Sequence, residues 1–372
     1  MKKMNIHSKS IITIATLITA FSVQAQDFKR FSVSAGWLHV MPQGKANPFN
    51  INTGVKNGTE ATVGSISIDS FLNSVDPNAT FADLGGEVFN TKDSLDELIN
   101  DEILSTLFTD GEGNILPEVA GSATIDGLES WRSAGTGLEA DDVDTLGLTF
   151  SYYVNDKVSL QVIGGIPPKV DIKGKGEILA PLSGLALSSN DIVNILFANG
   201  IPLNQAIPIT NLGNKSKAAS ARAWTPALEV QYQFGQSGVN KFRPYIGAGL
   251  MYAYFNDIKL NPQIESDLEA AGHMIQNVLD GKAGAALDGT VSSGVMRVEV
   301  DTDDAIAPII TAGFTYDLNE NWYTVASVSY AKLNNKATID IINESTGVRL
   351  INATTKIDID PLITYLGVGY RF

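Results

Sequence analysis

Between Trp224 and Phe255 the chain alternates residue by residue, and few folds are compatible with such a pattern. In each arm of this stretch, one set of alternate positions is aliphatic in the middle and aromatic at the ends. The other set is small or polar. A period of two places the two sets on opposite faces of a β-strand. The polar segment Gly235–Lys241 joins the arms, so we expect a hairpin. An aliphatic face with aromatic ends is typical of a sheet in contact with lipid.

The same alternation recurs along the chain and predicts eight strands. These are Phe28–Val40, Thr145–Val154, Val158–Val170, Trp224–Phe234, 242–255, Ile306–Leu318, Trp322–Lys336 and Asp360–Phe372. Short turns follow the second, fourth and sixth strands, and the long connections are about 41–144, 171–222, 256–305 and 337–358. Outer-membrane barrels combine short periplasmic turns with long extracellular loops. We therefore predict an all-β fold, an eight-stranded antiparallel transmembrane β-barrel over residues 26–372; a soluble β-sandwich is the alternative.

The composition agrees with a barrel and excludes several other classes of protein. Hydrophobic residues make up 44% of the chain, yet the mean hydropathy is only +0.05, whereas a bundle of membrane helices is far more apolar. The net charge of −15 argues against nucleic acid as a partner, because phosphates require a basic surface. Cysteine is absent, which excludes disulfides, thiol catalysis and cysteine-based metal sites.

The first 25 residues predict a signal peptide. Lys2, Lys3 and Lys9 make the start basic, and residues 11–21 form an apolar core that is too short to span a bilayer. Ala25 ends the segment with the small residue that a cleavage site requires. We therefore expect an exported mature chain beginning near Gln26. An uncleaved anchor is the alternative.

Helical spacing inside the long connections predicts short helices. The segments are Ser94–Phe108, Asp191–Asn199 and Gln263–Leu279. Ser94 and Glu97 fit a capping box, and Asn261 followed by Pro262 fits a helix start. Because isolated short helices are marginal in water, we expect the first and third to pack against the barrel rim or against each other. The connection 337–358 also alternates, which predicts strands that continue beyond the membrane.

The inward-facing positions of the predicted strands change character with height. Near the periplasmic end they form a predicted polar plug of Gln161, Glu229, Gln231, Arg243 and Arg371. Near the outer end they form a predicted apolar funnel and ligand site of Leu38, Val40, Ile163, Met251, Phe255, Ile309 and Ile363. An eight-stranded barrel is wide enough only to be filled by side chains or to hold one small ligand. Ordinary core packing beneath the loops therefore remains an alternative for the funnel.

Catalytic and metal-binding patterns are weak. Beyond the signal segment the histidines are His39 and His273, and no motif pairs either with a nucleophile. The acidic stretches 110–114, 141–144 and 301–304 suggest calcium, but Ile115 stands where an EF-hand loop requires glycine. We therefore expect no catalytic residues, no cofactor and no metal site.

Four blocks of the sequence resemble the OmpW family of small outer-membrane barrels. They are Lys241–Gly249, with its Phe-Arg-Pro-Tyr-Ile-Gly core, and Leu146–Ile172, Ala312–Leu333 and Asp360–Phe372. The resemblance implies a location in the outer membrane of a Gram-negative bacterium. It also implies a narrow channel or lateral-diffusion route for small hydrophobic molecules.

The expected partners follow from this interpretation. They are outer-membrane lipid and lipopolysaccharide, small hydrophobic permeants, and the insertion machinery that recognises a C-terminal strand ending in Phe372. We expect a monomer without nucleic acid. The rival hypothesis is a structural or adhesive barrel with a sealed interior, whose long loops bind a surface partner; a barrel enzyme is a third.

Overall fold

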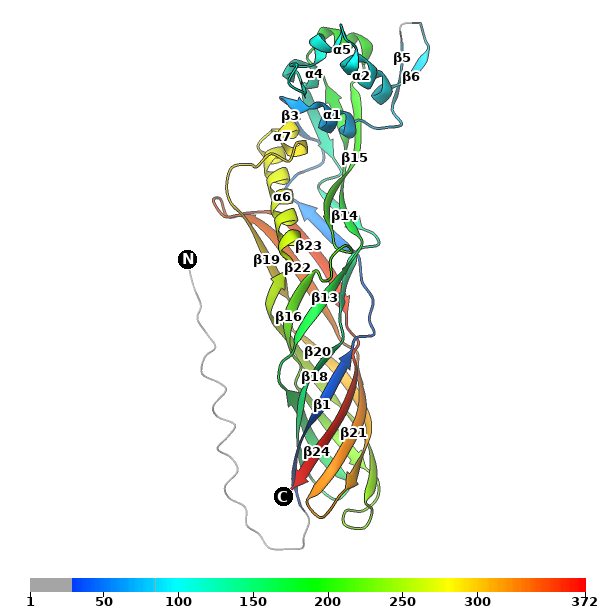
Figure 1. The fold of residues 1–372 in the computed structure, drawn as a ribbon, viewed down its shortest axis with the longest axis vertical. Coiled ribbons are helices and arrows are strands. Elements are labelled where there is room, and N and C mark those ends of the chain that lie inside the picture. The colour runs from blue at the N-terminus through cyan, green and yellow to red at the C-terminus, as the bar shows by residue number, and fades with distance from the viewer. Residues whose placement is uncertain (1–28, 84) are drawn as a thin grey trace.

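The computed structural model describes residues 29–83 and 85–372, and the predicted signal peptide lies outside them. The molecule is elongated, with a barrel at one end and a long extension at the other (Figure 1). The barrel strands are β1 (Phe31–Met41), β11 (Val143–Tyr153), β12 (Val158–Gly165), β17 (Ala227–Gln233), β18 (Phe242–Leu260), β20 (Ala305–Asp317), β21 (Trp322–Ala331) and β24 (Leu362–Arg371). Every neighbouring pair is antiparallel, and β12 pairs with β17 to close the barrel. The predicted eight-stranded barrel is confirmed.

Asparagine side chains shape two short turns at the periplasmic end of the barrel. The side-chain oxygen Oδ1 of Asn155 accepts hydrogen bonds from the backbone amides of Lys157 and Val158. Asn319 Oδ1 accepts them in the same way from Asn321 and Trp322. Such local side-chain bonds favour tight turns over continued strand. The C-terminus lies at the same end of the barrel (Figure 1).

The outward face of the barrel is aliphatic, as the alternation in the sequence predicted. Leu148, Val162, Leu228, Leu250, Phe314, Val328 and Leu366 are all exposed, by 39% to 58%, on the outside of the barrel. Aromatic residues flank them, including Trp37, Tyr252 and Tyr254 towards the extension and Tyr232, Phe242 and Trp322 towards the short turns. Among the described residues, no helix has the length and apolarity needed to cross a membrane.

The four long connections fold together into the extension. β10 (Gly137–Ala140), β13 (Lys169–Lys175) and β16 (Ala219–Trp224) continue the barrel wall beside β18. A four-stranded sheet contains β15 (Ile201–Asn211), β14 (Glu177–Leu187), β8 (Ser122–Asp126) and β3 (Thr59–Thr62). A five-stranded sheet contains β19 (Met296–Thr302), β22 (Asn334–Asn343), β23 (Val348–Asp358), β2 (Phe49–Thr53) and β9 (Ser130–Ser133). The hairpin of β22 and β23 confirms the predicted strands beyond the membrane.

Short elements complete the extension. The remaining strands pair as β4 (Ile66–Ser67) with β7 (Asn114–Ile115), and β5 (Thr80–Ala82) with β6 (Val88–Asn90). The helices are α1 (Ile68–Ser74), α2 (Thr91–Asn100), α3 (Ser105–Phe108), α4 (Pro117–Ala120), α5 (Asp191–Leu196), α6 (Pro262–Leu279) and α7 (Ala283–Leu287). Helices α1, α2, α4 and α5 gather at the end of the molecule far from the barrel (Figure 1).

The structure corrects parts of the helix predictions. The segment Ser94–Phe108 is two helices, and the cap of the first is Asn90, whose side chain accepts a hydrogen bond from Asp93, so the predicted capping box is wrong. The helix predicted to run to Asn199 ends at Leu196. The Asn261–Pro262 start of α6 is confirmed, and its predicted apolar face is buried.

The predicted packing of these helices is wrong. Helix α6 lies against β15, β19, β22 and β23 in the extension, and α2 lies against α1, α3 and β6. Neither covers the barrel rim, because α6 is buried on the sheets of the extension and α2 on the neighbouring short helices and β6.

Strand β18 passes from the barrel into the extension through a β-bulge. Opposite Ser220 and Arg222 of β16, it carries an extra residue beside Asp257, which has a positive φ of 50°. Below the bulge the inward side chains are Met251, Ala253 and Phe255, and above it they are Ile258 and Leu260. An inserted residue shifts the alternation of a strand by one position. The inward set therefore changes from odd to even numbers at the junction.

Candidate functional site: an apolar cavity above a polar floor

The polar residues predicted to plug the barrel form a hydrogen-bonded network. Glu229 is fully buried and accepts hydrogen bonds from Thr311 Oγ1 at 2.6 Å and Gln231 Nε2 at 3.2 Å. Gln231 also donates to Gln161 Oε1 at 2.6 Å, and Gln161 donates to Ser151 at 3.0 Å. The network joins neighbouring strands across the interior. Gln161, Glu229 and Gln231 therefore lie together, as the parity of their strands predicted.

Two arginines close the barrel beneath this network. Arg243 Nη2 donates to the Asp156 carbonyl at 2.5 Å, in the turn between β11 and β12. Arg371 Nη1 donates to Asp317 Oδ1 at 2.5 Å, and its guanidinium lies 4.3 Å from the centre of the Tyr323 ring. Both arginines are almost fully buried. These arginines, together with Gln161, Glu229 and Gln231, form the polar floor of the barrel. The arginines bind the periplasmic turns and strand ends rather than Glu229.

Tyrosines that the sequence analysis missed also pack inside the barrel, and Tyr323 lies at the level of Arg371 within the floor. Tyr323 donates to Ser32 Oγ at 3.1 Å, and the Tyr365 hydroxyl lies 2.8 Å from Ser34 Oγ. A Cβ on Gly369 would come within 2.2 Å of the Tyr323 ring, so only glycine leaves room for it. Tyr365 shares the strand parity of Ile363, so the alternation contained this signal.

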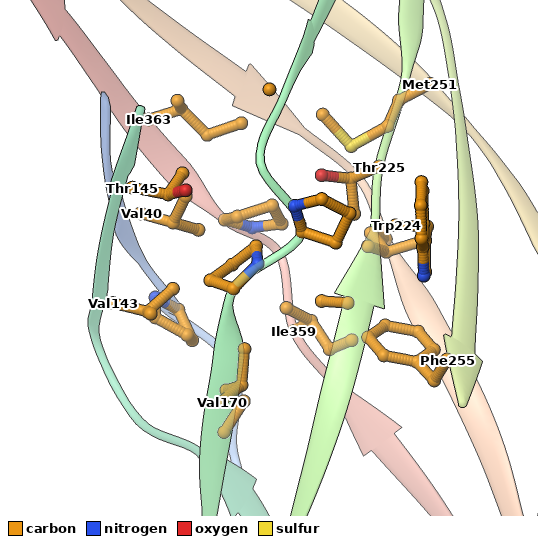
Figure 2. Close-up of a pocket in the computed structure, with 18 of the residues that line it drawn as sticks. Val40, Val143, Thr145, Val170, Trp224, Thr225, Met251, Phe255, Ile359 and Ile363 are labelled. Atoms are coloured by element: carbon orange, nitrogen blue, oxygen red, sulfur yellow. The ribbon is translucent and has the colours of Figure 1, made fainter. Parts of the chain in front are cut away.

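An apolar cavity of about 690 Å³ lies above the floor. All seven residues of the predicted ligand site line it: Leu38, Val40, Ile163, Met251, Phe255, Ile309 and Ile363. Figure 2 shows Val40 and Ile363 on one side of the cavity and Met251 and Phe255 on the other. The structure thus brings the seven residues together. Their role in binding a ligand stays a prediction.

The cavity continues from the barrel into the extension. Its upper wall includes Leu138 of β10, Ile264 and Leu268 of α6, Ile339 of β22, and Leu212, which follows β15. Sequence reasoning could not assign these residues, because their contact depends on pairings between distant segments. The result is one largely apolar conduit that reaches down to Gln161, Gln231 and Gln233 of the polar interior and runs beyond the barrel.

The barrel wall is interrupted beside this cavity, in a slit between β12 and β17. The ladder between the two strands ends at Ile163 and Ala227, and pairing resumes at Lys169 and Arg222 in β13 and β16. In the described part of the chain, no ladder pair joins residues 164–167 to residues 224–226. Residues on the β12 side of the slit instead stay bonded to β11, and residues on the β17 side stay bonded to β18.

Prolines explain why the slit does not close. Pro167, Pro168 and Pro226 lack the N–H that a sheet ladder needs. Ile166 and Trp224 line the cavity and are also 57% and 41% exposed on the outside, so they lie in the opening. The predicted third strand, extended to Val170, was therefore wrong at its outer end. The unpaired residues 224–226, at about 3.3 Å per residue along the strand, make the slit roughly 10 Å long.

Ion pairs surround the junction between barrel and extension. Lys173 lies 2.8 Å from Asp141, and this hydrogen bond lowers the pKa of Asp141 and raises the pKa of Lys173. Lys356 lies 2.8 Å from Asp358 and lowers the pKa of that carboxyl. These exposed pairs contribute little stability but keep both partners charged.

The suggested catalytic and calcium groups are engaged elsewhere. His39 contacts Asp144 at 2.8 Å and His273 contacts Ser292 at 2.9 Å, but within the described residues neither histidine has both a serine and a carboxylate as partners. Asp110 accepts hydrogen bonds within its own turn, and Asp304 accepts one from Tyr252. In the part of the chain that the structure covers, no group of three or more histidine or acidic side chains has the geometry to hold a metal.

A closed antiparallel barrel with a lipid-facing aliphatic band and aromatic borders defines an outer-membrane β-barrel protein. The family model described as "OmpW family" matches residues 111–288 and 283–372. The chain therefore belongs to the OmpW family, whose members are outer-membrane proteins of Gram-negative bacteria.

Individual relatives are more distant. The chain is 23% identical over 269 residues to Outer membrane protein W of Vibrio cholerae serotype O1, covering 72% of this chain and 92% of that protein. It is 25% identical over 261 residues to Outer membrane protein AlkL of Ectopseudomonas oleovorans, covering 68% and 92%. Against the crystal structure of OprG from Pseudomonas aeruginosa the TM-score is 0.47, with 16% identity and coverage of 94% and 99%.

Proposed function

We propose that this protein admits small apolar molecules through the outer membrane by a lateral route. A permeant enters the conduit in the extension, descends to the funnel, and leaves through the slit into the outer leaflet. The observation that carries this proposal is the continuous apolar cavity, which adjoins an opening in the barrel wall and ends on a polar floor. Membership of the OmpW family, whose barrels are associated with the passage of small hydrophobic molecules, supports the same function.

The floor supports a sideways exit over a direct passage. An apolar guest that displaced the contacts of Gln161, Gln231 or Glu229 would leave buried polar groups unpaired, at a cost of about 1–3 kcal/mol for each neutral group and more for a charged one. The acyl chains of the bilayer impose no such cost. The slit therefore offers the lower barrier.

Uptake of naphthalene by vesicles containing the protein tests the route. Gly164 borders the slit, and a Cβ added there has no heavy atom within 4 Å, so Gly164→Trp places a large side chain at the opening with room for its Cβ. We expect uptake to fall severalfold. Ala312→Trp adds the same side chain to the lipid face of β20, which does not border the slit, and should leave uptake unchanged.

Three results separate the parts of this proposal. Uptake equal to that of protein-free vesicles contradicts the transport function. Normal uptake by Gly164→Trp contradicts the lateral exit alone. Met251→Asn places an amide in the apolar wall and should slow uptake about tenfold, since an unpaired polar group costs on the order of 1–3 kcal/mol. Unchanged uptake by that variant would mean that the permeant bypasses the funnel.

An adhesive function is the second candidate, and one observation favours it. Val88, Ile103 and Ile195 on the distal end of the extension are 65%, 79% and 64% exposed. Exposed apolar side chains gathered in one region often mark an interaction surface. Combined Ile103→Ser and Ile195→Ser should reduce cell adhesion if this function holds, and should leave naphthalene uptake unchanged.

A further inference from the structure

Two cations face each other directly above the slit. Lys169 of β13 and Arg222 of β16 are register partners at the first pair where the ladder resumes, and both side chains are exposed. Facing side chains on adjacent antiparallel strands have Cβ atoms about 4.5–5.5 Å apart. Like charges at such positions repel each other and destabilise the sheet. An anion between them would remove that repulsion.

The neighbouring cations differ from this pair because each has a carboxylate. Lys217 lies 2.9 Å from Asp171, and Lys259 lies 3.4 Å from Asp257. The carboxylates of Asp171 and Asp257 are therefore already engaged. Among the described residues, neither Lys169 nor Arg222 forms an ion pair. Arg222 Nη1 instead donates to the Pro167 carbonyl at 3.3 Å, which directs its guanidinium to the rim of the slit.

The height of the pair matches the head-group region of the outer leaflet. Arg222 lies two residues beyond Trp224 on the same face, which is about 7 Å further along the strand in the direction away from the membrane centre. Trp224 pairs with Tyr254 in the outer aromatic border, and such borders mark the membrane interface. A head group held by Lys169 and Arg222 would thus stand at the interface, with its chain beside the slit.

We propose that Lys169 and Arg222 bind the anionic head of an acyl-chain amphiphile whose tail lies in the slit. The inference rests on the lateral route and adds a ligand class to it. Two sources supply this chemistry: a long-chain carboxylate leaving the cavity, and a phosphorylated lipid such as lipopolysaccharide arriving from the leaflet. Lysine and arginine form charge-assisted hydrogen bonds to carboxylate and phosphate alike.

Equilibrium binding to the full chain in phosphatidylcholine vesicles tests the site. The probes are dodecanoate, dodecanol, which has the same chain without the charge, and lipopolysaccharide. In the double variant Lys169→Gln, Arg222→Gln we expect dodecanoate to bind about tenfold more weakly and dodecanol to bind as before. The matched control Lys332→Gln, Lys356→Gln removes two junction cations away from the slit and should bind both probes as the parent does.

The lipopolysaccharide arm identifies the source. If lipopolysaccharide displaces dodecanoate from the parent and loses affinity in the Lys169→Gln, Arg222→Gln variant, the site serves the leaflet lipid. If only dodecanoate responds, the site serves a permeant. Equal affinities of parent and variant for both anions would overturn the proposal, as would an equal loss for dodecanol. Comparing dodecanol uptake by the parent and by Gly164→Trp checks the lateral route separately, so a failed anion site and a failed route give different results.

Discussion

The barrel and the extension use the same alternating strands but turn their apolar faces in opposite directions. In the barrel, Leu250 points to lipid, while Glu229 points inward and is fully buried. In the extension, Ile341 of β22 and Leu350 of β23 are buried and Lys356 faces water. Alternation therefore identifies a strand, whereas the medium on each side decides which face is inside. Two regions with opposite requirements meet in one continuous wall, and the cavity crosses the boundary between them.

The largest expected effect comes from the polar interior of the barrel. Arg371→Met leaves the Asp317 carboxylate, which is only 14% exposed, without its cation. Breaking a buried ion pair by removing one partner costs about 3–5 kcal/mol. The matched change Lys356→Met removes an exposed pair from the extension and should cost less than about 1 kcal/mol. Urea unfolding in lipid vesicles measures both, and equal costs would contradict the contrast between the two interiors.

A core truncation in the extension should be nearly as costly but local. Ile275 of α6 is fully buried, and Ile275→Ala should destabilise the extension by about 2–5 kcal/mol through lost burial and a cavity. Hydrogen exchange should quicken in α6 and the strands that it covers, with barrel amides unchanged. Equal loss of protection in the barrel strands would show that the two regions unfold as one unit.

Arginine on the outer surface distinguishes lipid from water. Leu250→Arg at mid-membrane depth should cost about 2–4 kcal/mol, and Tyr254→Arg near the interface about 1 kcal/mol or less. Val348→Arg on the exposed surface of the extension should change stability by no more than about 0.5 kcal/mol. Folding into vesicles compares the three. Similar costs at Leu250 and Val348 would mean that Leu250 does not face lipid.

The smallest expected effect is a pH response confined to the extension. Hydrogen bonds from the Asn114 side chain, and then from the amides of Glu112 and Asn114, hold the pKa of Asp110 below its ordinary value. A lowered pKa stabilises the turn above the ordinary value, and this contribution is lost as the pH falls below about 4. Amide NMR shifts at residues 110–114 should change there. Asp110→Asn should abolish the change, and a persistent response would assign it to another group.

The barrel could be predicted from the sequence because its signals are local. Strand parity placed all seven funnel residues on one cavity, and height along each strand separated them from Glu229 and Gln231. The slit could also have been predicted from the sequence, since Pro167 and Pro168 lack the N–H groups that a strand ladder requires.

The sheets of the extension were beyond such reasoning. Strand β2 pairs with β23 almost three hundred residues later, and nothing in either segment specifies the other. The upper cavity wall, with Ile264 and Ile339, depends on these pairings, and so does the burial of α6. Only the hairpin of β22 and β23 was foreseen, because its two strands are adjacent in sequence.

The bulge beside Asp257 makes the lengths of the two regions independent. The bulge changes which alternate positions of β18 face inward. The number of residues above it can therefore change without altering which residues below it face inward. Deletion of Asp257 would remove the bulge and leave a strand of unbroken alternation, in which Ile258 and Leu260 still face the cavity and Lys259 still faces water. An ancestral barrel could thus gain or lose height outside the membrane in single-residue steps, with its lipid-facing register untouched.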